Sequence, residues 1–355
     1  MKNYIRFRLM NKQVLTIFTS LVILLILLLL LNISLGSVYI PFHKTLTFLI
    51  GKDIGHIGWE NILIQFRIPK AITAILVGSG LGISGLLMQT LFRNPLAGPF
   101  VLGISSGASL GVAIAILTGM SFGLAINQLG IGGSWILTVS ASFGAFLVLS
   151  VVILVSLKIR DSMSLLIIGL MFGSATGAIV SVLQFFSKAE SIQAYLIWTF
   201  GSLGGLTWEE LKIFIPVIFL TLGWAYTFSK SLNALLLGDN YSRSMGVNIK
   251  KTRLIIIIAT SLLAGTITAF CGPIAFIGIA IPHITRLLFN TANHKVLFPM
   301  VIFSGAILML FCDIIAQMPG KEYTLPINAV TSVLGAPIVI WLVVRRKDFS
   351  KSFSG

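Results

Sequence analysis

Long apolar runs recur along the whole chain, and short polar or basic stretches separate them. Because the bilayer core needs about 20 apolar residues per helix, each run predicts a helix that crosses a membrane. The predicted spans lie near residues 14–36, 69–92, 99–118, 133–157, 162–187, 211–229, 254–271, 275–288, 298–318 and 325–344. The eighth span is short and contains Pro282, His283 and Arg286, which favours a broken or partly buried helix. The pattern predicts an all-α, polytopic membrane protein with one transmembrane domain over residues 1–355.

The composition supports a surface that largely faces lipid. Hydrophobic residues make up 56% of the chain and charged residues only 10%, whereas soluble domains carry about 25% charged residues. The first apolar run, residues 21–31, reaches bilayer length with its apolar flanks, and no cleavage site follows it. We therefore expect a retained first span and not a removed signal.

Basic residues set the predicted orientation. If the ten spans alternate, 18 of the 25 Lys and Arg residues fall on the side of the N-terminus and the other 7 on the opposite side. The positive-inside rule then places both termini in the cytoplasm, with the chain in the cytoplasmic membrane. The net charge of +15 is scattered over short loops. It forms no single stripe, so we expect no nucleic-acid partner.

Glycines occur at helical spacing inside the apolar runs. Residues 80–85 spell G-x-G-x-x-G, but a dinucleotide fold needs a strand before this motif and an acidic residue about 20 positions later. Neither is present, so we reject that interpretation. Small residues spaced four apart let helices approach closely in lipid. We expect close packing, or alternatively sliding faces during transport, at Gly78, Gly82, Gly85, Gly103, Gly107 and Gly111.

Catalytic motifs are missing from the sequence. Gly320-Lys321 lacks the upstream glycine of a Walker A loop, so we expect no nucleotide hydrolysis by this chain. The predicted spans hold no cluster of metal ligands, and no metal site is predicted. Asp313 is the carboxylate expected to be deeply buried, where it either bridges helices or serves transport. Cys271 and Cys312 lie in apolar stretches, and the sequence leaves their pairing open.

Three polar segments are candidates for contacts outside the membrane. Residues 230–253 form a cytoplasmic, mildly amphipathic stretch that suits short surface helices and a soluble partner, or an ordinary basic loop. On the outer side, Arg67 and Lys70 lie on one helical face, where they anchor the interface or dock an acidic partner. Residues 92–100, with two prolines, form either a plain turn or a narrowing of the pathway.

Several stretches, in order, resemble the FecCD-type permease subunits of ATP-binding-cassette importers for ferric siderophores, haem and cobalamin. They are "RIPK", "LVGSGLGISGLLMQTLFRNPLAGPFVLGISSGASLG", "LLLGDNYSRSMGVNI", "GPIAFIGIAIPHITRLL" and "LPINAVTSVLGAPIVIWLV". The resemblance covers most of residues 60–344. It implies a ten-span bundle like that of cobalamin permeases, which works as a homodimer with the pathway between the copies. It also implies two separate ATPase subunits, which use the ATP, and an extracytoplasmic binding protein.

The same resemblance implies roles for particular residues. Arg67 and Lys70 match basic residues that dock the binding protein; a third basic position is Gln317 here, with Lys321 nearby. Asn94 and Leu96 match a cytoplasmic constriction. The ATPase-coupling residues would be Gly238, Asp239, Ser242 and Gly246 within 230–253. His283 lies in a stretch typical of the family, which favours a structural role over haem ligation.

These features predict an ABC importer permease, not itself an enzyme, with no cofactor bound by this chain. A ferric siderophore is the expected ligand, with haem or cobalamin as alternatives. An ATP-independent secondary transporter is the second hypothesis, and a membrane enzyme the third.

Overall fold

The computed structural model describes residues 2–118, 133–158, 162–318, 321 and 323–344, and all its regular elements there are helices. The helices are α1 (Lys2–Ser34), α2 (Phe42–Leu49), α3 (Ile57–Ile62), the π-helical η1 (Leu63–Arg67), α4 (Ile68–Phe92), the 3₁₀ turn η2 (Pro99–Leu102), α5 (Ile104–Leu117), α7 (Gly133–Lys158), α8 (Ser162–Phe185), α9 (Ala189–Thr199), α10 (Trp208–Thr227), α11 (Ser229–Leu236), α12 (Asp239–Ser244), α13 (Ile249–Cys271), α14 (Ile277–Phe289), α15 (His294–Ala316) and α16 (Ile327–Val344).

Each of the ten predicted spans coincides with one of these helices. Seven helices of the described chain are long and apolar enough to cross a membrane, and they match the first, second, fourth, fifth, sixth, seventh and ninth spans. Shorter apolar helices, α5, α14 and α16, lie at the other three. The all-helical, multi-pass prediction is confirmed, whereas the count of ten crossings stays a prediction.

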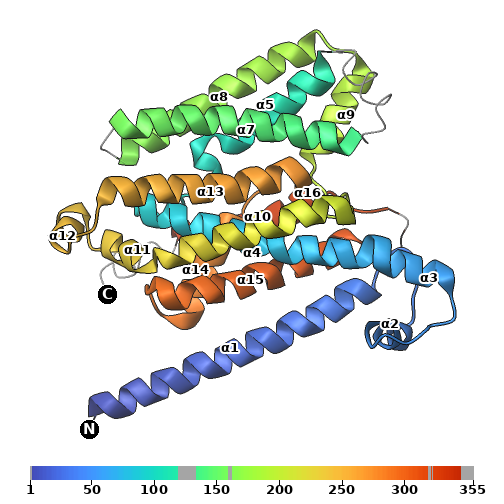
Figure 1. The fold of residues 1–355 in the computed structure, drawn as a ribbon, viewed down its shortest axis with the longest axis horizontal. Coiled ribbons are helices and arrows are strands. Elements are labelled where there is room, and N and C mark those ends of the chain that lie inside the picture. Colours follow the sequence, from blue (N-terminus) through green and yellow to red (C-terminus); the bar gives the residue numbers. More distant parts are fainter. Residues whose placement is uncertain (1, 119–132, 159–161, 319–320, 322, 345–355) are drawn as a thin grey trace.

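Helix α4 lies at the centre of the bundle (Figure 1). It contacts α1, α10, α13, α14 and α15, and it is buried along nearly its whole length. Helices α5, α7 and α8 form a separate layer on one face, drawn in cyan and green, and α1 lies along the opposite face. A helix that is apolar all round fits this position, because it meets protein on every side.

The two ends of the bundle differ in the elements they carry. The N-terminal end of α1 lies at the same end as α11 and α12, whereas α2, α3 and α9 lie at the other (Figure 1). This agrees with the predicted placement of the N-terminus and residues 230–253 on one side. Some of the basic residues in the charge count, among them Arg160, Arg345 and Arg346, lie outside the described residues.

Several predicted boundaries are wrong. The segment 230–253 contains the short helices α11 and α12, so the helical alternative for it is confirmed over an ordinary loop. It also contains the first turn of α13, which starts at Ile249 and not near residue 254. Asn248 caps this helix, accepting a hydrogen bond from the Lys251 amide at 3.0 Å. Hydrophobicity alone could not place this start, because the first turn carries Lys250, Lys251 and Arg253.

Glycines mark the closest approaches between helices. A Cβ on Gly78 or Gly85 of α4 would overlap a backbone oxygen of the facing helix, from Gly305 and Gly278 respectively. On α5, Gly111 similarly faces the Ser140 oxygen, and a Cβ on Gly107 would lie 2.6 Å from the Gly144 oxygen.

Two of the six glycines differ from this pattern. A Cβ on Gly82 would meet side chains instead, with the Val301 Cγ1 at 3.0 Å. Gly103 does not belong to a helix face: it lies between η2 and α5 with φ of 73°, a conformation that favours glycine. The predicted helical spacing fails there because the third span starts with the 3₁₀ turn and becomes α-helical only after Gly103.

The cysteines are not bonded to each other. Cys271, at the end of α13, and Cys312, in α15, are both free and buried. They act as small core residues, which resolves the alternative that the sequence left open.

Candidate functional site

Residues 229–248 form a compact unit at the cytoplasmic end of the bundle, which we call the coupling segment. Gly238 separates α11 from α12 with φ of 107°, a value that side chains disfavour. The buried Ser242 closes the turn, because its hydroxyl lies 2.7 Å from both the Ala234 and the Gly238 carbonyl oxygens. Gly246, with φ of 79°, leads on toward α13. The four predicted coupling residues therefore lie together in one folded unit.

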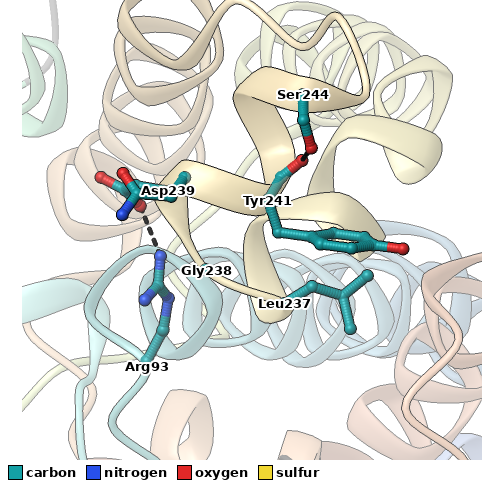
Figure 2. A pocket seen from close by; sticks show the side chains of 7 residues that line it. Arg93, Leu237, Gly238, Asp239, Tyr241 and Ser244 are labelled. Atoms are coloured by element: carbon teal, nitrogen blue, oxygen red, sulfur yellow. Dashed lines mark hydrogen bonds and ion pairs between the residues drawn. The ribbon is translucent and has the colours of Figure 1, made fainter.

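Asp239 fastens this unit to two transmembrane helices. One carboxylate oxygen pairs with Arg93, at the end of α4 (Figure 2), and the other lies 2.6 Å from an Arg253 nitrogen on α13. Arg93 also donates from Nε to the Leu235 carbonyl oxygen at 3.0 Å. These groups are partly exposed, so we expect each ion pair to stabilise the fold by about 1 kcal/mol at most. They also connect α12 directly to α4 and α13.

An open cleft of about 650 Å³ lies beside the ion pair between Arg93 and Asp239, and Figure 2 shows these residues and Tyr241 around it. The exposed side of the coupling segment carries large apolar side chains among polar ones, although it lies at the end of the bundle. Leu237, Tyr241 and Met245 are each more than half exposed. Large apolar side chains next to charged ones are typical of a surface that binds another protein.

The turn after α4 places the predicted constriction residues. Arg93 ends α4 in the left-handed conformation, and Asn94 accepts a hydrogen bond from the Leu96 amide at 3.0 Å. This local bond fixes the chain direction before Pro95 and leaves both Asn94 and Leu96 half-buried. The geometry makes a rigid turn beside the coupling segment. A role in closing the pathway stays a prediction.

At the opposite end, Arg67 lies inside the protein. Its guanidinium donates to the carbonyl oxygens of Ile33 at 2.9 Å and Ser34 at 2.6 Å, and also to that of Val38. These oxygens belong to the end of α1 and the chain after it, where carbonyls lack partners within the helix. Arg67 is 8% exposed. The structure thus gives it an internal role, and its docking role stays a prediction.

Asp313 is the centre of a polar cluster next to Arg67. The buried carboxylate lies 3.0 Å from Lys70 Nζ and accepts hydrogen bonds from Asn32 at 2.8 Å and Gln317 at 2.6 Å. Asp313 therefore bridges α15 to α1 and α4. This is the structural alternative expected for it, and the bridge satisfies a carboxylate in an apolar bundle.

Only some of the predicted docking residues come together. Arg67, Lys70 and Gln317 line a cavity of about 320 Å³, and Lys70 is about one-fifth exposed there. Lys321 is exposed and does not line this cavity. Where the family pattern expects a basic residue, Gln317 bonds internally to Asp313. Gln317 is buried and uncharged, so this position adds no basic side chain to the face.

Two adjacent groups of hydrogen-bonded polar side chains, largely buried and near the cytoplasmic end, were not predicted from the sequence. They comprise Gln89 and Thr90 of α4, Asn233 of α11, Arg286 of α14 and His294 of α15. The available signal was the presence of polar and ionisable residues at the ends of apolar spans, which are functional candidates by default. Among the described residues no three His, Cys, Asp or Glu converge as metal ligands. His283 is buried within α14.

The family is decided by the match of residues 24–345 to the FecCD transport family. The chain belongs to that family. It is 34% identical to the vitamin B12 import system permease protein BtuC of Klebsiella pneumoniae, over 92% of this chain and 93% of BtuC. BtuC of Salmonella typhi is also 34% identical, over 81% of this chain and 84% of that protein.

Solved structures agree with this assignment. An inward-facing ABC transporter of the metal-chelate type has a TM-score of 0.80 and 29% identity, covering 93% of this chain and 99% of that one. PsaBC from Streptococcus pneumoniae, with a TM-score of 0.50 and 18% identity over 79% of this chain and 92% of that one, shows similarity of fold alone. The FecCD chain is thus a multi-pass transport protein of the bacterial cytoplasmic membrane.

Proposed function

We propose that this chain is the permease subunit of an ATP-binding-cassette importer, and that two copies enclose the pathway for a large metal chelate. The FecCD family match over residues 24–345 carries the proposal. The described fold supports the proposal, because the folded cytoplasmic segment of the helical bundle offers a surface to an ATPase subunit. The sequence itself contains no Walker A motif.

The coupling segment is the proposed seat of a separate ATPase subunit. The apolar contact comes from Leu237, Tyr241 and Met245. The two ion pairs of Asp239 transmit a displacement of α12 to α4 and α13. In this scheme ATP binds and is hydrolysed in the partner. Closure of two ATPase subunits displaces two coupling segments, and the ligand crosses without covalent change.

The opposite end is the proposed seat of the extracytoplasmic binding protein. Lys321 is exposed there, and Lys70 lines the cavity with part of its side chain accessible. Acidic side chains of a partner would pair with these lysines, which favours encounter and orientation more than affinity. Arg67 contributes by holding the end of α1 in place.

Cobalamin is the proposed ligand. The two BtuC relatives are named for vitamin B12 import, and they support the cobalamin alternative better than the ferric siderophore that the sequence led us to expect. The metal-chelate description of the structural relative is compatible with either chelate.

Reconstitution with a panel of ligands tests the proposal. The chain is placed in liposomes with its ATPase subunit and binding protein, and uptake of radiolabelled cobalamin, a ferric siderophore and haem is compared under ATP. We expect ATP-dependent accumulation of cobalamin. Uptake of the ferric siderophore and of neither other compound would show that the siderophore is the ligand. Uptake by the chain without the ATPase subunit or without ATP would instead show a secondary transporter.

A further inference from the structure

Asn233 of α11 joins the coupling segment to the start of α15 through one side chain. Its Oδ1 accepts hydrogen bonds from the His294 amide at 2.8 Å and from the His294 ring at 2.7 Å. Its Nδ2 donates to Asn293 Oδ1 at 2.9 Å. All these partners belong to the N-cap and first residue of α15. Both the oxygen and the nitrogen of the Asn233 side-chain amide form hydrogen bonds, so the orientation of the amide is fixed. These bonds hold α11 against the start of α15.

His294 continues this connection into the core. Its side chain is fully buried. The ring Nδ1 must donate, since its partner is the Asn233 oxygen. The ring Nε2 lies 2.8 Å from Thr90 Oγ1 on α4. One imidazole therefore joins α11 on one side and α4 on the other, with both nitrogens engaged.

Thr90 and the adjacent Gln89, near the C-terminal end of α4, bond to neighbouring helices. Because Nδ1 of His294 donates, Nε2 accepts, and the Thr90 hydroxyl is the donor at 2.8 Å. The Leu86 carbonyl oxygen, also 2.8 Å from this hydroxyl, shares its single proton. The adjacent Gln89 accepts from Arg286 at 2.6 Å and donates to the Ile279 carbonyl oxygen at 3.1 Å, both on α14. Displacement of α11 therefore has a bonded route to α15, α4 and α14.

We propose that Asn233, His294 and Thr90 are positioning residues that transmit movement of the coupling segment to the central helix α4. This rests on the proposed function, since it presumes a motor acting on that segment. The Asp239 ion pairs are partly exposed to solvent. The bonds of Asn233 to His294 are part-buried, and the bond between His294 and Thr90 is buried. Breaking the buried bond leaves a polar group without water, so this step of the route resists slipping.

Thr90→Val is the decisive variant, and Thr285→Val is its matched control. Both threonines are buried, and both lie 2.8 Å from the carbonyl oxygen four residues earlier in their helix. Of the two, Thr90 has the hydrogen bond to another helix. Valine keeps the side-chain volume, so a difference between the variants reports the bond to His294 and not packing.

The measurement is the number of ligand molecules imported per ATP hydrolysed by the full reconstituted complex, using the ligand that the wild type transports. We expect Thr90→Val to lower this ratio by about fivefold, within the range of typical coupling energies. ATP hydrolysis should continue, Thr285→Val should match the wild type, and Thr90→Ser should restore the ratio.

Two substitutions of His294 separate its two contacts. Asparagine places an amide nitrogen near the Nδ1 position and keeps the bond to Asn233, whereas glutamine reaches the Nε2 position and keeps the bond to Thr90. We expect both to lower the transport ratio, because the route needs both contacts.

The outcomes distinguish this inference from the function on which it rests. No ATP-driven uptake by the wild-type complex overturns both. Uptake by the wild type with an unchanged ratio in Thr90→Val overturns the transmission route alone. Equal losses in Thr90→Val and Thr285→Val also overturn it, because a general packing defect then explains the result.

Discussion

Replacing Gly85 by alanine tests the close packing of α4 most sharply. A Cβ at this position would lie 2.8 Å from the Gly278 Cα on α14, and closer still to the Gly278 carbonyl. The tightest contact, with the Gly278 carbonyl oxygen, sets the displacement. Carbon and oxygen in close contact lie about 3.3 Å apart, so the two backbones must separate by about 1.5 Å. No rotamer change relieves this overlap, because the obstructing atoms are backbone.

Such overpacking costs about 3 kcal/mol, the upper end of the range for added methyl groups in tight cores. At about 2–4 °C per kcal/mol, we expect the apparent Tm of the detergent-solubilised protein to fall by about 6–12 °C. Scanning fluorimetry measures this at one fixed heating rate, since unfolding of such proteins is often irreversible. ATP-driven uptake should fall as well, because Gln89, one turn further on, bonds to α14.

Gly177→Ala is the control, because a Cβ there would meet nothing within 4 Å. We expect its Tm to stay the same or rise slightly, since alanine favours a helix over glycine. Gly82→Ala should lie between the two, because its obstructing atoms are side chains that can adjust. Equal Tm values for Gly85→Ala and Gly177→Ala would refute the packing account.

Three further predictions follow from the polar contacts. Asp313→Asn removes the charge that pairs with Lys70, so we expect a loss of about 1–3 kcal/mol and a lower Tm. Glu209 forms an exposed ion pair with Lys212, and Glu209→Ala is the control expected to leave the Tm unchanged. Asp239→Ala removes the ion pairs with Arg93 and Arg253. We expect little change in Tm but a weaker stimulation of ATP hydrolysis by the binding protein. Stimulation equal to that of the wild type would contradict the coupling role. Lys321→Glu should slow binding-protein association about tenfold at low salt, measured by surface plasmon resonance, and an unchanged rate would remove Lys321 from the docking face.

The long apolar runs were sufficient to predict the helical bundle. A run of apolar residues must be helical in lipid, because its backbone groups can find partners only within the segment. Helical segments outside the bilayer carry no such signal. For this reason α2, α9 and the charged first turn of α13 were not placed from the sequence, although α9 and α2 now define the outer end.

The site residues were predictable where their chemistry is local. Gly238 and Gly246 mark turns by residue type, and both have positive φ. Arg67 was misleading because its partners come from the end of α1, over 30 positions earlier. The His294 network was missed for the same reason: it unites α4, α11 and α15, and no spacing along the chain reveals that contact.

We infer that ATP hydrolysis in a partner drives transport through this chain. The most direct test measures cobalamin accumulation in liposomes that hold the chain, the binding protein and an ATPase subunit whose Walker A lysine is either intact or replaced by alanine. We predict accumulation against a gradient with the intact subunit and none with the variant. Equal accumulation with both subunits would contradict the account.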